Sequence, residues 1–321
     1  MNKKINRFFN LVIIVLIILI IILYGYKNIF NGNITKNTSD VKKVSFSNRS
    51  EVSVYFLDVG QADSMFITDG TNNILIDAGN NADGAKIVDY LKNEFKISEL
   101  NMIVLTHPHE DHIGGMDDVI NAFNIDNILM PNVISTSKSF ESVLDTIDKK
   151  EYKITVPNID DKYNYGDMEF TVLSVGKNQK KLNDSSIVLK LLYHNNCFLF
   201  MGDASKNVEK KLLDKDIACD VIKIGHHGSE YSTSSDFINK VNPKYAVIEV
   251  GKNNIYEHPR QVILDRLSEK NIKVFRTDID GTINFISDGN NIKYEFLNTD
   301  LDGWCYVYDR KYNWWYCEVR K

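Results

Sequence analysis

A histidine-rich stretch, residues 106–115, holds the side chains with the clearest potential for chemistry. It reads Thr-His-Pro-His-Glu-Asp-His-Ile-Gly-Gly, which follows the pattern His-x-His-x-Asp-His. Neutral imidazole and carboxylate suit Zn²⁺ and its neighbours in the first transition row. Histidines at i and i+2 can bind one metal ion, while the Asp and His at i+4 and i+5 turn toward a second. A polar loop whose histidines cap a helix or face water is the alternative, but chance seldom produces four such positions. The candidate ligands are His107, His109, Asp111 and His112.

The elements around this stretch place it at the end of a strand. The apolar run Met102 to Leu105 predicts a buried strand, and Gly114 and Gly115 break the chain before a helix near Met116. Other acids and imidazoles also follow apolar runs or lie in Gly- or Pro-bearing loops, where α/β sheets place their ligands. Taken singly, an Asp there is more typical of a helix N-cap. Together with the histidine-rich loop they predict one two-metal site. These residues are Asp77, Asp203, His226, His227 and His258.

Length, composition and charge set the wider limits. The chain has 321 residues, of which 43% are hydrophobic and 25% charged, as is ordinary for a globular protein. This length allows one large domain with appendages or two smaller domains. The formal net charge of -5 provides no overall basic field, so any attraction to phosphate must be local or come from a metal.

The N-terminus is predicted to anchor the chain in a membrane. Basic residues occur within the first seven positions, and Phe8 to Tyr26 is an apolar segment interrupted only by Asn10 and Gly25. At about 1.5 Å per residue it would extend roughly 28 Å, enough for a bilayer core. A cleaved signal peptide is the alternative, but no Ala-x-Ala-like site follows. We therefore expect residues 1–26 to be a cytoplasmic tip and transmembrane anchor, residues 27–50 a linker, and the rest extracellular, or secreted if the segment is cleaved.

The cysteines divide into two pairs with different expected roles. Cys305 and Cys317 lie in the aromatic tail, residues 298–321, which reads as a hairpin and could be closed by a disulfide between them. Cys197 and Cys219 fall in apolar runs and are predicted to be buried thiols. No Cys-x-x-Cys pair is present, which argues against a cysteine zinc site. The tail is either structural or presents aromatic rings to a glycan or a base.

Residues 51–297 alternate between strand and helix patterns, which predicts mixed sheets covered by helices. Several of their motifs resemble the metallo-β-lactamase-fold hydrolases and, more narrowly, the C-terminal domain of ComEC/Rec2-type competence proteins. The resemblance covers about Glu51 to Phe296 and implies an α/β fold, an αββα sandwich with metals at one edge. The motifs are Tyr55–Asp63, Ile76–Gly79, Thr106–Gly115, Asn183–Ser186, Gly202–Ala204, Lys223–Ser229, Glu257–Pro259 and Arg276–Asp278.

The resemblance also implies roles for individual residues. His107 and His109 would bind one metal, Asp111 and His112 the other, and Asp203 would bridge the two ions. The last imidazole ligand, on the second metal, is predicted to be His258. His226 would lie close by as a ligand or proton donor, with His227 as the alternative if the register slips by one. Asp77 would orient the histidine-rich loop from behind. Residues expected around the metals or the substrate are Asp63, Asn183, Asp184, Ser186 and His227.

One departure from the general fold pattern affects the choice of metal. The pattern expects a further His between the histidine-rich loop and Asp203. The only one there is His194, which falls after the strand that begins at Ser186, and the loop Asn183 to Ser186 occupies the expected place, as in the competence subfamily. The first metal is then short of an imidazole, so Mn²⁺ competes with Zn²⁺ for a site of two divalent ions.

Two metal ions would suit phosphodiester hydrolysis, because both can neutralise charge on the phosphate oxygens. Asp111, His226 and Lys223 are the predicted catalytic residues, the last two by stabilising charge or protonating the leaving group. For Lys223 and His226, a surface lysine and a structural histidine are the alternatives.

The predicted function is a membrane-anchored extracellular nuclease acting on DNA or another phosphodiester polymer. Separate competence or cell-wall components are the implied partners, and the oligomeric state stays open. A phosphorylcholine-esterase-like wall enzyme, a lactam or ester hydrolase and a non-catalytic binding protein are the alternatives.

Overall fold

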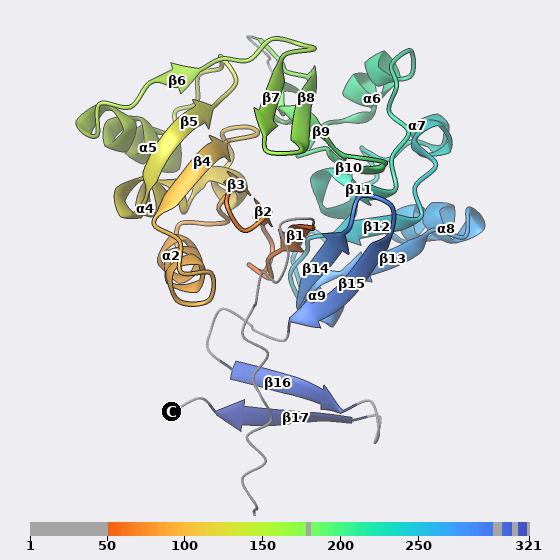
Figure 1. Cartoon of the computed structure of the whole chain (residues 1–321). Helices are drawn as coiled ribbons and strands as arrows, with labels where there is room; N and C mark the ends of the chain where they lie inside the picture. Colours follow the sequence, from red (N-terminus) through yellow and green to blue (C-terminus); the bar gives the residue numbers. More distant parts are fainter. Residues whose placement is uncertain (1–50, 178–180, 298–303, 310–313, 320–321) are drawn as a thin grey trace, which may run out of the picture. The chain divides into compact units, whose positions relative to one another are not determined.

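The computed structural model describes residues 51–177 and 181–297, together with the backbone of residues 304–309 and 314–319 (Figure 1). The predicted anchor, residues 1–26, and the predicted linker, residues 27–50, lie outside the described residues. Within the described part of the chain, no helix is both long and apolar enough to cross a membrane.

The first sheet joins the start and the end of the domain. Its order is β15-β14-β1-β2-β3-β4-β5-β6, in which β1 to β3 and β14 to β15 pair antiparallel and β3 to β6 pair parallel. Its strands are β1 (Val52–Phe56), β2 (Met65–Thr68), β3 (Asn73–Ile76), β4 (Glu99–Val104), β5 (Asn124–Leu129), β6 (Ile154–Thr155), β14 (Thr282–Ser287) and β15 (Ile292–Leu297).

The second sheet has the same mixed character. Its order is β13-β12-β11-β10-β9-β8-β7, with antiparallel pairing from β7 to β10 and parallel pairing from β10 to β13. Its strands are β7 (Lys162–Tyr165), β8 (Met168–Ser174), β9 (Val188–Tyr193), β10 (Asn196–Phe200), β11 (Val221–Lys223), β12 (Tyr245–Ile248) and β13 (Lys273–Arg276).

Helices cover the outer face of each sheet, so both faces of the central strands are buried. In β1, Val54 and Phe56 belong to the core between the sheets, while Tyr55 packs into the core beneath the helices of the first sheet. Such alternation with apolar residues on both faces is typical of strands covered on two sides. The helices are α2 (Gly84–Asn93), α3 (Glu110–Ile113), α4 (Met116–Ala122), α5 (Lys138–Lys149), α6 (Lys206–Leu212), α7 (Ser235–Val241), α8 (Gln261–Glu269) and α9 (Thr277–Asp280), with 3₁₀ turns η1 (Leu182–Ser185) and η2 (Gly225–Gly228).

The predicted αββα sandwich is confirmed, and its topology explains where the candidate ligands meet. The parallel strands β3 and β4 end just before Asp77 and the histidine-rich loop, and β10 and β11 end just before Asp203 and the His226–His227 pair. Parallel neighbours have their carboxyl ends at the same edge of a sheet. The ends of the two sheets therefore supply the two halves of one site.

The cysteine prediction needs correction. Cys197 and Cys219 are not buried thiols but form a disulfide across a sequence separation of 22. Cys197 lies in β10 and Cys219 just before β11, its parallel neighbour, so strand pairing brings the two together. In the tail, β16 (Trp304–Asp309) and β17 (Trp314–Val319) pair antiparallel, and Cys305 is opposite Glu318 rather than Cys317. The disulfide predicted between Cys305 and Cys317 concerns side chains outside the described structure.

Reduction of the Cys197–Cys219 disulfide is expected to lower the free energy of unfolding by about 3 kcal/mol, because the bond closes a loop of 22 residues in the unfolded chain. Urea denaturation with and without reductant measures the difference. A Cys197→Ala, Cys219→Ala double variant should respond to reductant less than the native chain does. If the native chain unfolds at the same urea concentration with and without reductant, the disulfide does not contribute to stability.

Candidate metal centre

The histidine-rich loop is held close to its neighbours by two glycines. It leaves β4, passes through His107 and His109, and enters α3 at Glu110. A Cβ atom on Gly114 would lie 2.4 Å from the backbone nitrogen of Asn81, and one on Gly115 would lie 2.5 Å from the carbonyl oxygen of Ala78. Because no other residue fits there, the Gly-Gly pair lets this loop pack directly against the loop that follows β3.

The first group of candidate ligands consists of His107, His109 and Asp203, whose ligand atoms all lie within 4.8 Å of one another. The His107 Nε2 and His109 Nδ1 atoms are 3.0 Å apart, and Asp203 Oδ2 is 3.6 Å from His107 Nε2. Burial, followed by the nearby His112, holds the pKa of His107 well below its usual range, and burial also lowers the pKa of His109. Neutral imidazoles with free lone pairs are the form that binds a divalent ion.

The second group consists of Asp111, His112 and His227. His227 Nε2 is 3.2 Å from Asp111 Oδ2, and His112 Nε2 is 3.3 Å from Asp203 Oδ1. Burial lowers the pKa of His227, but the carboxylates of Asp63 and Asp203 outweigh burial and raise it to about 10. Burial also lowers the pKa of His112, but the carboxylates of Asp203, Asp77 and Asp111 together outweigh burial and raise it. The acidic surroundings therefore favour positive charge at this group.

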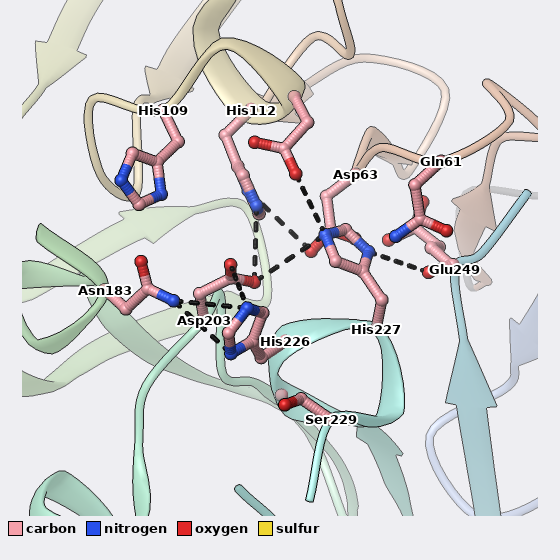
Figure 2. Close-up of polar contacts among 12 residues, drawn as sticks. Gln61, Asp63, His109, His112, Asn183, Asp203, His226, His227, Ser229 and Glu249 are labelled. Carbon is pink, nitrogen blue, oxygen red and sulfur yellow. Dashed lines mark hydrogen bonds and ion pairs between the residues drawn. The ribbon is translucent and has the colours of Figure 1, made fainter. Parts of the chain in front are cut away.

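Asp203 joins the two groups, because its two oxygens face different histidines (Figure 2). His112 Nε2 and Asp203 Oδ1 are buried and have no hydrogen-bond partner among the described residues. Unpaired buried polar atoms are costly, and a cation between them would satisfy both. The imidazole and carboxylate donors of both groups fit divalent transition-metal ions, and the shared carboxylate fits a pair of neighbouring ions.

His258 does not lie where the sequence prediction placed it. Among the described residues it belongs to none of the ligand groups, and His227 stands beside Asp111 and His112 instead. The ring of His258 packs edge-on against His226 with centroids 5.8 Å apart. The adjacent His226 and His227 have φ angles of 53° and 50°, an uncommon left-handed turn. That turn decides which imidazole enters the site, and a sequence pattern cannot fix it.

Asp77 lies behind the histidine-rich loop, as predicted. Its carboxylate accepts hydrogen bonds from the backbone N–H of Thr106 at 2.8 Å and from the Thr106 hydroxyl at 2.7 Å. Its Oδ2 atom is also 2.8 Å from His112 Nδ1. A carboxylate on the far nitrogen of an imidazole fixes the ring's orientation and tautomer, which leaves Nε2 of His112 for a metal.

Lys223, a predicted catalytic residue, is buried rather than open to a substrate. The side chain is 0% exposed, and its Nζ atom lies 2.6 Å from Asp63 Oδ2 and 3.8 Å from Glu249 Oε2. Asp63 in turn lies 3.2 Å from His227 Nδ1 through its Oδ1 atom. Burial raises the pKa of Asp63, but Lys223, His227 and His112 together outweigh burial and lower it to about 2. The lysine is thus a buried counter-ion that supports His227 through Asp63.

Glu249 was not among the predicted residues, although it follows β12 as Asp77 follows β3. Its side chain is fully buried; Oε1 accepts a hydrogen bond from the Ser64 N–H at 3.0 Å, and its backbone oxygen lies 2.9 Å from His227 Nδ1. The rule that acids at strand ends form the site would have found it.

The remaining predicted residues divide into two sets. Asn183 and Ser186 adjoin the site: the Asn183 amide nitrogen is 3.3 Å from the ring of His226, and Ser186 Oγ accepts a hydrogen bond from the Asp203 N–H at 3.1 Å. His226 is 27% exposed, with Nε2 3.7 Å from Asp203 Oδ2 (Figure 2). Asp184 instead accepts a hydrogen bond from Ser205, the residue before α6, and lies in none of the ligand groups of the described residues.

Comparison with known proteins identifies the family to which the chain belongs. Residues 57–251 match the Metallo-beta-lactamase superfamily, and the chain belongs to it. The chain is 31% identical to ComE operon protein 3 of Bacillus subtilis, over 74% of this chain and 33% of that protein. It is 27% identical to competence protein ComA of Neisseria gonorrhoeae, over 77% of this chain and 34% of that protein. Within the superfamily, the chain is therefore related to ComEC-type competence proteins, and it spans about a third of the length of these curated relatives.

A solved structure supports the same fold. The metallo-beta-lactamase fold protein YhfI from Bacillus subtilis aligns with a TM-score of 0.50 at 11% identity, covering 76% of this chain and 99% of that one. At that identity the likeness concerns the fold alone. Together, the family match and the His and Asp ligand groups support a metal-dependent hydrolase.

Proposed function

We propose that the chain is a two-metal phosphodiesterase that cuts DNA. The observation that carries the proposal is the pair of ligand groups joined by Asp203, His107 with His109 on one side and Asp111 with His112 and His227 on the other. Two divalent ions, when bound, would supply the Lewis acidity that activates water and neutralises charge on the phosphate. Either Zn²⁺ or Mn²⁺ suits these ligands.

The chain's own residues would handle the protons. The Asp111 side chain is 31% exposed, so its carboxylate is available to accept a proton from the attacking water. His226 faces Asp203 from the exposed side of the site and can donate a proton to the departing oxygen. A bond forms between the water oxygen and phosphorus, the bond from phosphorus to the leaving oxygen breaks, and the released alcohol keeps the proton from His226. Asn183 holds the His226 ring in place.

DNA is favoured as substrate by the relatives, which are named for competence and, in Haemophilus influenzae, for recombination. Both processes handle DNA. With a formal net charge of -5, the chain has no overall basic field, so the ions themselves would provide much of the attraction to phosphate. We further propose that the apolar segment Phe8 to Tyr26 holds the domain at the outer face of a membrane, where it would meet extracellular DNA and separate competence components.

A cleavage assay tests the proposed function. The full chain, purified in mild detergent, is stripped of metal, reloaded with Mn²⁺ or Zn²⁺ and incubated with end-labelled single- and double-stranded DNA, a choline phosphodiester and a lactam. We expect metal-dependent DNA cuts that a His107→Ala variant, with an unchanged circular-dichroism spectrum, does not produce. Release of choline without DNA cuts would indicate that the enzyme hydrolyses cell-wall phosphodiesters and not DNA. Turnover of the lactam alone, or of none of the substrates, would overturn the phosphodiesterase proposal.

A further inference from the structure

The loop between β12 and α8, residues 251–260, presents apolar side chains to solvent beside the site. Ile255 is 88% exposed and Tyr256 is 55% exposed. The same loop carries His258, whose ring lies next to Tyr256 at a centroid distance of 5.9 Å and an angle of 24° between planes. An exposed aromatic ring stacked on a histidine near the metal ligands is unusual for a surface loop, which is normally polar.

The loop is held firmly. The Asn254 side chain donates hydrogen bonds to the carbonyl oxygens of Gly251 and His258 at 3.0 and 2.7 Å, and accepts one from the His258 N–H at 2.9 Å. Glu257, directly after Tyr256, has a φ angle of 56°. A residue other than glycine in that region is strained, and such strain is commonly found at functional sites. The hydrogen bonds of Asn254 therefore hold the backbone on both sides of Tyr256.

A series of rings connects Tyr256 with the Asp203 carboxylate. The His258 ring next to Tyr256 also contacts His226 at a centroid distance of 5.8 Å, and His226 Nε2 lies 3.7 Å from Asp203 Oδ2. Tyr256 is thus two ring contacts from His226, which in turn faces the Asp203 carboxylate. A group bound on Tyr256 would lie on the same side of the site as His226, the proposed proton donor.

We infer that Tyr256 is a stacking residue for an unpaired base next to the scissile phosphodiester, so that the preferred substrate is single-stranded nucleic acid. The inference rests on the proposed phosphodiesterase function. Bases of a strand without a partner can stack on aromatic side chains, whereas bases inside a duplex offer no free face. Substrate preference would then arise from Tyr256, while the metals supply the chemistry.

The ring geometry favours a base over a quaternary ammonium group. Tyr256 and His258 are near parallel at 24°, and among the described residues no other aromatic ring contacts Tyr256. A single flat face matches a planar base. A quaternary ammonium is typically held in a cage of several aromatic rings, which these contacts do not form.

The test compares Tyr256→Ala and Tyr256→Phe with the native full chain, loaded with Mn²⁺, on a single-stranded oligonucleotide and on the same strand with abasic residues beside the cleavage position. We expect Tyr256→Ala to lower kcat/KM on the normal strand by about 5- to 100-fold, mainly through KM, and Tyr256→Phe to keep it near the native value. On the abasic strand all three should cut at the same rate. Tyr231→Ala is the matched control, because Tyr231 is 70% exposed and has no ring contact with His226 or His258 among the described residues.

The outcomes separate the two proposals. If the native chain cuts no nucleic acid, the proposed function fails and the inference fails with it. If the native chain cuts DNA but Tyr256→Ala cuts the normal strand at the native rate, only the inference is overturned. A loss of choline phosphodiester turnover, with DNA cutting unchanged, would overturn the base-stacking role in favour of cation binding.

Discussion

An Asp203→Ala variant is expected to lose metal-dependent hydrolysis by about 10³-fold or more, which corresponds to roughly 4 kcal/mol of barrier. The reason is that one carboxylate faces both ligand groups, with Oδ2 3.6 Å from His107 Nε2 and Oδ1 3.3 Å from His112 Nε2. Its removal would take a ligand from each ion at once. The measurement is kcat/KM on DNA together with the metal content of the purified variant.

Asp216→Ala is the matched control, since that aspartate is 88% exposed and pairs with Lys190 at the surface. The Asp216→Ala variant should bind as much metal as the native chain and have the same kcat/KM on DNA. An Asp203→Ala variant that still binds two ions per chain and cuts at the native rate would show that Asp203 is not needed to hold either ion.

Replacement of the buried lysine, Lys223→Met, is expected to lower the free energy of unfolding by about 3 to 5 kcal/mol. Lys223, Asp63 and Glu249 are all 0% exposed, and the substitution would deprive the buried Asp63 carboxylate of its nearest cation, 2.6 Å away. Methionine keeps the length of the side chain, so the loss is chiefly electrostatic. Chemical denaturation of the metal-free chain measures the change without a contribution from bound ions.

The exposed pair Lys162 and Glu169 supplies the comparison, with side chains 55% and 34% exposed. Lys162→Met should cost less than about 1 kcal/mol, because surface ion pairs contribute little. A Lys223→Met variant with native stability and greatly reduced kcat would restore the catalytic role that the sequence analysis assigned to this lysine.

The sequence predicted the parts of the site that depend on local pattern. The histidine-rich loop is a run of neighbouring residues, so its four candidate ligands were visible without knowledge of the fold. Asp77 and Asp203 were found because each directly follows an apolar strand, and parallel strands bring such positions to one edge. The sandwich itself followed from alternating strand and helix patterns together with the family motifs.

The errors concern features that depend on contacts between distant segments or on backbone conformation. The choice of His258 over His227 depended on a left-handed turn at two adjacent histidines. The burial of Lys223 depends on Asp63, which lies 160 positions earlier in the chain. The pairing of Cys197 with Cys219 required the parallel register of β10 and β11. None of these leaves a periodic signal in the sequence.

The most direct test of the central claim is X-ray diffraction from crystals of the full chain soaked with Mn²⁺, recorded for the anomalous signal of the metal. We expect two peaks, one among His107, His109 and Asp203 and the other among Asp111, His112, Asp203 and His227. A missing peak at either position, or a second peak on His258 in place of His227, would contradict the two-metal site.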